Sequence, residues 1–182
     1  MEQGRIIVIS GAPGTGKTTA AALAARDTAA EKSVCMRTDD FYAHLCKGAV
    51  APHLPQADTQ NGVVIEAFLQ AAMRYARGGY EVMVDGVVGP WFLSPFCAAA
   101  KVCEVHYIVL RADREETLRR AVGRDKLDRE TNAALVEAMW PQFAQLGAYE
   151  RHVIDTTRLT PQETAERILT GVERGTYRLK EI

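Results

Sequence analysis

The segment with the clearest chemistry is a glycine-rich run that ends in a lysine and two threonines. It reads Gly11-Ala12-Pro13-Gly14-Thr15-Gly16-Lys17-Thr18, followed by Thr19, and it satisfies the pattern G-x-x-x-x-G-K-[ST]. Glycines allow the backbone to approach phosphate oxygens closely, and consecutive N–H groups at a helix start bind anions. Lys17 adds a positive charge near the β- and γ-phosphates, and the Thr18 hydroxyl is a ligand for Mg²⁺. The segment predicts a site for ATP and Mg²⁺.

Carboxylates follow two apolar stretches further along the chain. Asp39 and Asp40 follow the strand-like run Val34–Arg37 in the sequence Thr38-Asp39-Asp40, and Asp85 follows the run Val82–Val84. Because the carboxyl ends of neighbouring parallel strands face the phosphate loop, Asp39 is placed to accept a proton from an attacking hydroxyl. Asp40 is the alternative base, or it caps the next helix, and both residues could be turn residues. Asp85 is predicted to contact Mg²⁺, directly or through water, with a turn-forming Asp-Gly pair as the alternative.

Arginines are dense in the stretch that follows the last long apolar run. They are Arg114, Arg119, Arg120, Arg124 and Arg129. Arg120 and Arg124 are four residues apart and therefore share one face of a helix. Phosphoryl transfer needs positive charge around the moving oxygens. We therefore expect Arg124, or its neighbour Arg120, to reach the nucleotide, and we assign transfer to Arg124 and nucleotide binding to Arg120. A solvated helix face accounts for Arg114 and Arg119.

The elements that position these residues alternate between strand and helix, which predicts an α/β fold with a parallel sheet and helices on both faces. The predicted strands are Arg5–Ser10, Val34–Arg37, Glu81–Val84, Val102–Leu110 and Val153–Asp155. The predicted helices are Thr18–Lys32, Val63–Arg77, Arg114–Val122, Thr131–Gln145 with a break at Pro141, and a last one from a capping box at Thr160 to about Glu173. Residues 41–62 fit no element well, except for a short helix over 41–47, and predict a lid or a mobile segment.

The length, charge and composition of the chain limit which partners we expect it to bind. The chain has 182 residues, a net charge of −1 and 25% charged residues, which suits one domain over residues 1–182. Without a basic excess, we do not expect a nucleic-acid partner. The first apolar run, Ile6–Ile9, is too short for a leader or a membrane span, so we expect a cytoplasmic protein that does not enter membranes. A homodimer stays open.

The motifs together resemble those of the small P-loop kinases, over nearly the whole chain. The phosphate loop, Asp39, Asp85-Gly86 and Arg120-x₃-Arg124 are similar to gluconate kinase, shikimate kinase, chloramphenicol phosphotransferase and the kinase-like AAA-domain family. The resemblance implies a three-layer α/β/α P-loop kinase fold with a five-stranded parallel sheet of order 2-3-1-4-5. It also implies a substrate-side segment at about 41–62, a lid at about 124–131, Asp39 as the base, and Thr156 beside the adenine.

One departure from the family bears on the acceptor. Nucleoside monophosphate kinases carry an arginine just after a DGxP-like motif, whereas here Trp91 follows Pro90. This favours a neutral or aromatic-compatible acceptor over a phosphate-bearing one. Trp91, Phe92 and Phe96 either wall an acceptor pocket or pack in the core. The glycine triplet of shikimate kinase and the arginine-glycine-histidine segment of gluconate kinase have no match.

These observations predict an ATP-dependent phosphotransferase that moves the γ-phosphate to a hydroxyl of a small molecule. One alternative is a P-loop ATPase or switch whose product is a conformational change. A second is a polynucleotide 5′-hydroxyl kinase, which the near-neutral charge disfavours because strand binding normally uses a basic groove.

Overall fold

The central element of the computed structural model is a sheet of five parallel strands; residues 3–123 and 128–179 are described. The strands are β1 (Arg5–Ser10), β2 (Ser33–Arg37), β3 (Glu81–Asp85), β4 (Glu104–Arg111) and β5 (Val153–Asp155). Their spatial order is β2-β3-β1-β4-β5. The predicted order 2-3-1-4-5 is confirmed, and each strand lies within two residues of its predicted bounds.

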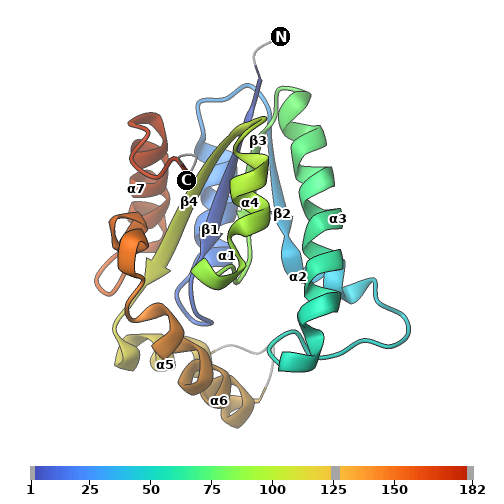
Figure 1. Cartoon of the computed structure of the whole chain (residues 1–182). Helices are drawn as coiled ribbons and strands as arrows, with labels where there is room; N and C mark the ends of the chain where they lie inside the picture. The colour runs from blue at the N-terminus through green and yellow to red at the C-terminus, as the bar shows by residue number, and fades with distance from the viewer. Residues whose placement is uncertain (1–2, 124–127, 180–182) are drawn as a thin grey trace.

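Helices cover both faces of the sheet and form the outer two layers (Figure 1). They are α1 (Lys17–Asp27), α2 (Thr38–Ala43), α3 (Asp58–Arg77), α4 (Ser94–Ala99), α5 (Arg114–Val122), α6 (Arg129–Met139) and α7 (Pro161–Glu173). The 3₁₀ turns are Pro55–Ala57, Pro90–Phe92, Trp140–Phe143 and Gly147–His152. Helices α5 and α6 lie beyond the carboxyl ends of the strands, where the phosphate loop also lies (Figure 1).

Alternate side chains of each strand feed two separate hydrophobic clusters. On β1, Ile6 and Val8 join α3 and α4 on one face, while Ile7 and Ile9 join α1 and α7 on the other. Because both faces are covered, the central strands are buried and apolar along almost their whole length. This fixes the strand ends, and the polar residues that follow them, relative to one another.

Several predicted helix bounds were wrong for identifiable reasons. Helix α1 ends at Asp27 rather than Lys32, because the backbone of Thr28 is extended; the Thr28 side chain donates to Glu81. Helix α3 begins at Asp58 rather than Val63 and runs through Asn61-Gly62, a pair that normally signals a turn. Helix α4 was not predicted. Helix α6 ends at Met139, and Pro141 lies in the following 3₁₀ turn, as the predicted break requires.

Residues 41–62 are more ordered than their composition predicts. Helix α2 occupies the beginning of this segment, and Pro55–Ala57 and α3 occupy its end. The Gln60 side chain bonds both the N–H and the carbonyl of Val50, at 2.8 and 2.7 Å, and Asn61 donates to the carbonyl of Pro52 at 2.9 Å. The loop between the helices is therefore fastened to the first turns of α3. No helix within the described ranges is long and apolar enough to cross a membrane.

Candidate active site

The phosphate loop takes its shape from glycines in the left-handed region of backbone space. Gly11, Gly14 and Gly16 have φ of 139°, 91° and 93°. A Cβ on Gly11 would lie 2.2 Å from the carbonyl oxygen of Leu110, and a Cβ on Gly14 would lie 2.5 Å from that of Thr117. A Cβ on Gly16 would meet no described heavy atom within 4 Å, so this glycine is required by its backbone angle alone. The loop thus packs closely against the backbone of strand β4 and helix α5.

Lys17 is the first residue of α1, and its side chain folds back over the loop. Only 8% of Lys17 is exposed, and its Nζ donates to the carbonyl of Ala12 at 2.9 Å. Thr15 donates to the same carbonyl from its Oγ1, also at 2.9 Å. Thr18 and Thr19 follow on the exposed side of α1, so the Thr18 hydroxyl is accessible to a metal ion. The predicted phosphate-binding residues therefore form one continuous loop and helix start.

The predicted carboxylates lie at the carboxyl ends of two adjacent strands. Asp85 ends β3 and is only 6% exposed. Asp39 and Asp40 lie in the first turn of α2, with 62% and 61% of their side chains exposed. Both are thus helical residues, and neither is the N-cap, which is Arg37. The structure places Asp39 and Asp85 around a shared neighbour, while their chemical roles remain predictions.

That neighbour is Arg37, a site residue that the sequence analysis missed. Arg37 ends β2 and is the register partner of Asp85 on β3. Its guanidinium nitrogens lie 3.8 Å from Asp85 Oδ2, 4.0 Å from Asp39 Oδ2 and 3.9 Å from Asp40 Oδ1. In the sequence, Arg37 is marked only by its place at the end of β2, two residues before the carboxylate pair, and its nearness to Asp85 comes from strand register. Arg37 places a positive charge among three negative ones.

The donor set fits a magnesium ion that arrives with a nucleotide. Within residues 3–123 and 128–179, no group of three or more His, Cys, Asp or Glu side chains could hold a metal alone. Mg²⁺ in phosphate sites needs only one or two protein oxygens, with phosphates and waters completing its shell. The Thr18 hydroxyl and the Asp85 carboxylate are such hard oxygen donors. The nearest Arg37 nitrogen is too far from Asp85 for a hydrogen bond, so that carboxylate keeps lone pairs for a metal.

A cavity of about 500 Å³ opens beside the phosphate loop. It is lined by Gly14, Thr15, Gly16, Thr19, Ala20, Glu116, Arg119, Arg120, Thr157, Arg158, Leu159, Thr160, Pro161 and Thr164. Its walls come from α1, α5 and the turn between β5 and α7. The cavity adjoins Gly14 and Gly16 of the phosphate loop.

Arg120 closes one wall of this cavity. Its Nε donates to Glu116 at 2.6 Å, and its Nη2 donates to the carbonyls of Thr156 and Thr157 at 3.0 and 3.3 Å. Hydrogen bonds from Arg119 first, and then from Arg120, lower the pKa of Glu116 to about 2, so this carboxylate stays ionised and anchors both arginines. Arg120 is thus fixed against the segment after β5.

Thr156, which follows β5, contacts the phosphate loop at Thr15. It is 1% exposed, its Oγ1 lies 3.5 Å from the carbonyl of Thr15, and its N–H donates to Arg111. The cavity wall itself is formed by the next residue, Thr157. Arg124 and residues 124–127 of the expected lid lie outside the described residues.

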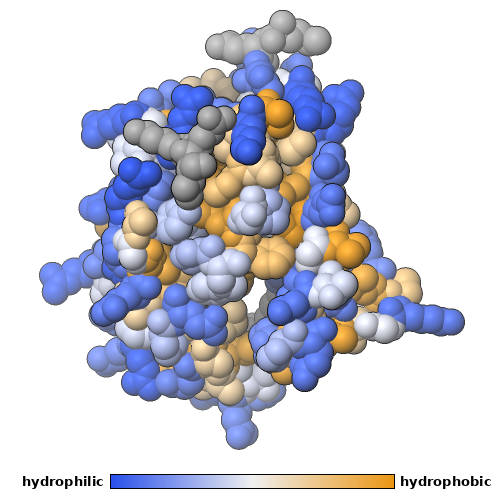
Figure 2. Space-filling view, in the orientation of Figure 1, coloured by the Kyte–Doolittle hydropathy of each residue, from blue (hydrophilic) through white to orange (hydrophobic). Residues whose placement is uncertain are grey.

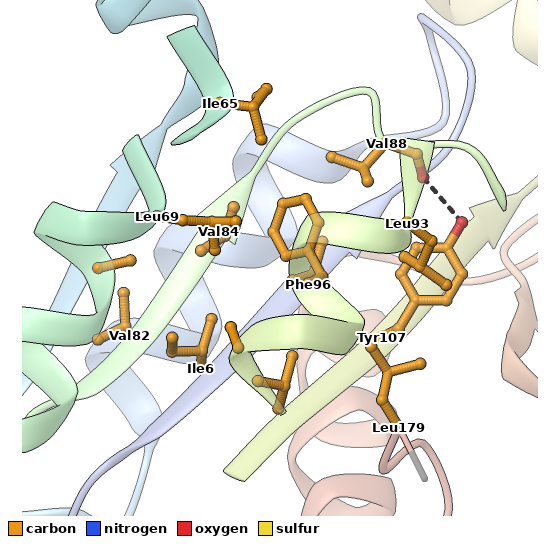
Figure 3. Close-up of a cluster of buried hydrophobic side chains, with 14 of the residues drawn as sticks. Ile6, Ile65, Leu69, Val82, Val84, Val88, Leu93, Phe96, Tyr107 and Leu179 are labelled. Carbon is orange, nitrogen blue, oxygen red and sulfur yellow. Dashed lines mark hydrogen bonds between the residues drawn. The ribbon is translucent and has the colours of Figure 1, made fainter. Parts of the chain in front are cut away.

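The loop after β3, residues 86–92, is anchored to the sheet beneath the phosphate loop. The Val88 carbonyl accepts hydrogen bonds from Ser10 Oγ and from Tyr107 Oη, both at 2.7 Å, and the Val88 N–H donates to Ser10 Oγ at 2.9 Å. Figure 3 shows the bond between Tyr107 and Val88. A Cβ on Gly86 would lie 2.5 Å from Thr38 Oγ1, so the same loop packs directly against the start of α2. This loop and α2 form one continuous wall.

The aromatic residues of this loop and of α4 divide between core and surface. Phe96 is fully buried among the residues of Figure 3. Trp91 is 56% exposed, and its ring lies over Gly89 and 5.4 Å from the ring of Phe143. Figure 2, in the orientation of Figure 1, shows a hollow in the molecule beside the lower half of α3 and above α6. Phe96 is therefore core, whereas Trp91 is an aromatic surface on the side of the carboxylates.

The strand order and the phosphate loop together define a P-loop kinase fold. The chain matches the AAA_18 family, described as AAA domain, over residues 7–140, and it belongs to that family. A protein of Thermococcus kodakarensis, provisionally named an adenylate kinase, is 30% identical over 177 residues, which cover 95% of this chain and 88% of that protein.

Solved structures share the fold over most of the chain. An unliganded sugar kinase of Janibacter superposes with a TM-score of 0.68 at 20% identity, covering 93% of this chain and 95% of that one. The APS kinase of Mycobacterium tuberculosis, in complex with AMPPNP and APS, gives 0.69 at 15% identity, with 95% and 99% covered. The tunicamycin resistance protein of Deinococcus radiodurans gives 0.61 at 22% identity, with 98% and 99% covered.

Proposed function

We propose that the protein is an ATP-dependent kinase that transfers the γ-phosphate of ATP to a hydroxyl of a small molecule. The observation that carries this proposal is the arrangement at one edge of the sheet. There the phosphate loop follows β1, the buried Asp85 ends β3, and Asp39 follows β2, with Arg37 between the two carboxylates. A phosphate-binding loop and an exposed carboxylate at the same end of the sheet supply a phosphate site and a base, the two parts that in-line transfer to a hydroxyl uses.

In the proposed reaction the acceptor oxygen attacks the γ-phosphorus. The bond between that phosphorus and the oxygen bridging it to the β-phosphate breaks, and ADP leaves with the bonding electron pair. Asp39 takes the hydroxyl proton late in the step. Lys17 and Arg124 stabilise the charge on the transferred group, and bound Mg²⁺, held by Thr18 and Asp85, would neutralise charge on the phosphates.

A second candidate acceptor is the phosphate of AMP. Its support is the Thermococcus kodakarensis relative with its adenylate kinase name, together with Arg37, a cation beside Asp39 that an anionic acceptor could contact. The aromatic Trp91, where the monophosphate kinases carry an arginine, favours the hydroxyl acceptor instead. AMP therefore belongs in the acceptor panel beside hydroxylated metabolites and antibiotics.

The test is ADP release from ATP·Mg²⁺ with and without each acceptor of the panel. We expect release to depend on an acceptor. Asp39→Asn should lower the transfer rate by about 10²- to 10⁴-fold, the usual contribution of a positioned base, and leave ATP affinity nearly unchanged. The matched control is Asp40→Asn, since Asp40 has the same exposure and the same arginine neighbour.

Three outcomes would contradict parts of the proposal. Release of ADP that does not depend on any acceptor would favour an ATPase or switch. A large loss in Asp40→Asn with little change in Asp39→Asn would move the base to Asp40. Equal losses of ATP affinity and of rate in Asp39→Asn would remove the base assignment altogether.

A further inference from the structure

Arg37 is held by charge rather than by directional hydrogen bonds. Its Nε is buried and has no hydrogen-bond partner among the described residues. The three carboxylates around its guanidinium lie at 3.8 to 4.0 Å, beyond the usual range of an N–H···O bond. A buried donor without a partner is costly, so such an arrangement in a folded protein calls for a reason beyond packing.

The sheet itself keeps Arg37 beside Asp85. The two residues are register partners at the ends of β2 and β3, so their backbones cannot separate without breaking the ladder. Asp85 is 6% exposed and has little water to stabilise its charge. Arg37, with 39% of its side chain exposed, is the neighbouring cation that the structure gives to this buried carboxylate.

A divalent cation at Asp85 would change this balance. It would satisfy the Asp85 carboxylate and would repel the guanidinium, since both carry positive charge. Arg37 would then be left to Asp39 and Asp40, which lie on its other side and at similar distances. Arg37 can thus pair either with Asp85, the carboxylate proposed to contact the metal, or with the carboxylates of α2.

We propose that Arg37 is a positioning residue that neutralises Asp85 without metal and competes with the metal–nucleotide complex for that carboxylate. The inference rests on the proposed function, because it takes Asp85 as the metal contact. Arg37 then sets how strongly Mg²⁺ and the nucleotide favour each other's binding. This is a coupling between two ligands, and it can be measured by binding alone.

The experiment compares ADP affinity with EDTA and with saturating Mg²⁺, by titration calorimetry, in the natural chain and in Arg37→Gln. The coupling is measured by a ratio, the dissociation constant of ADP in EDTA divided by the dissociation constant of ADP in saturating Mg²⁺. We expect Arg37→Gln to raise this ratio about five- to tenfold, because a unit charge near 4 Å is strongly felt even after partial screening. Metal-free ADP should bind more weakly next to uncompensated carboxylates, and Mg·ADP more tightly.

Two further variants control for charge and for folding. Arg37→Lys keeps the charge but loses the Nε that lies nearest Asp85, so its ratio should rise only about twofold. This variant also supplies the test if Arg37→Gln does not fold. Arg174→Gln makes the same change of net charge at the exposed C-cap of α7, beside the Glu173 that pairs with Arg5 at the other end of the sheet, and should leave the ratio unchanged.

The outcomes separate the two levels of the proposal. A ratio that is unchanged or lower in folded Arg37→Gln, or lower in Arg37→Lys, would overturn the role of Arg37 and leave the kinase proposal intact. Failure of the natural chain to bind ADP under either condition would overturn the proposed function, and the inference with it.

Discussion

Charged side chains gather at both ends of the sheet, but they are bonded very differently. At the amino end, Arg5 donates from Nε to Glu81 at 2.8 Å and from Nη2 to Glu173 at 2.5 Å. At the carboxyl end, Arg37 lies 3.8 to 4.0 Å from three carboxylates, with its Nε unpartnered among the described residues. Arg5 makes short hydrogen bonds to its carboxylates within the protein. The guanidinium of Arg37 makes none to its three carboxylates, so its Nε can still donate a hydrogen bond to a ligand.

The difference indicates where the fold is optimised for stability and where it is not. Unsatisfied polar groups and positive-φ backbone are tolerated at functional sites because the rest of the structure compensates for them. Among the described residues, the carboxyl end combines an unpartnered Arg37 Nε with three positive-φ glycines in one loop, whereas the amino end has single positive-φ glycines, such as Gly79, and an unpartnered Nδ1 on His106. Substitutions at the carboxyl end should therefore change function more than stability, and substitutions at the amino end should do the reverse.

The largest expected effect is that of Lys17→Met, at the carboxyl end. Methionine keeps the buried stem of the side chain but removes the charge. We expect the transfer rate to fall about 10²- to 10³-fold, the usual loss for one positioned donor, together with weaker ATP binding. The free energy of unfolding, measured in urea, should change by less than about 1 kcal/mol. A chain that does not fold would show that Lys17 is chiefly structural.

The sharpest form of the comparison uses two acidic residues of one strand. Glu81 begins β3 and Asp85 ends it, and they are 2% and 6% exposed. Glu81→Gln should cost about 1–3 kcal/mol of unfolding free energy, because it weakens bonds from Arg5 and Thr28. Asp85→Asn should cost less than about 1 kcal/mol, since it makes no short bond in the described structure, yet it should abolish most transfer.

The measurements are urea unfolding and ADP release, each made on both Glu81→Gln and Asp85→Asn. Two results would break the comparison between the two ends of the sheet. One is a loss of stability in Asp85→Asn as large as that in Glu81→Gln. The other is full activity in Asp85→Asn, which would also remove Asp85 from the metal site.

The parts of this arrangement that the sequence predicted are those with local signals. The phosphate loop, the capping box of α7 and the apolar runs of the strands each lie within a few residues of the chain. Arg37 was missed because its partner Asp85 is set by the register of β2 against β3, which no local pattern encodes. The start of α3 was missed because Asn61 bonds the carbonyl of Pro52 from within a helix, a tertiary contact that overrides its turn preference.

An intermediate effect is expected for Arg120, which we predict to bind the nucleotide, because its Nε and Nη2 are hydrogen-bonded and it lines the cavity beside the phosphate loop. Arg120→Gln should weaken ATP binding about tenfold, a typical loss for a charged hydrogen-bonding contact. The control is Arg114→Gln on the same helix, where the arginine pairs with Glu137 and does not line the cavity. Equal ATP affinities in the two variants, by calorimetry, would place the nucleotide elsewhere.

The smallest expected effect concerns His106, the exception among the bonded groups of the amino end. His106 is fully buried and bonds Glu104 through Nε2 at 2.8 Å, but its Nδ1 has no partner among the described residues. Burial lowers the pKa of His106, against the opposing pull of Glu104 and with smaller contributions from Arg5 and Arg178. The neutral form is therefore favoured in the folded protein.

Because the folded-state pKa of His106 lies below its unfolded value of about 6.5, the unfolded chain takes up the proton first as pH falls. Its contribution to stability is complete above that pH and is lost below it. We expect the unfolding free energy of the natural chain to drop between pH 7.5 and 5.5, and the drop to be smaller in His106→Gln by less than about 1 kcal/mol. The residual drop belongs partly to His152, whose pKa burial also lowers. An identical pH dependence in the two chains would mean that the unpartnered nitrogen of His106 has no energetic consequence, and that the amino end is as fully satisfied as its ion pairs indicate.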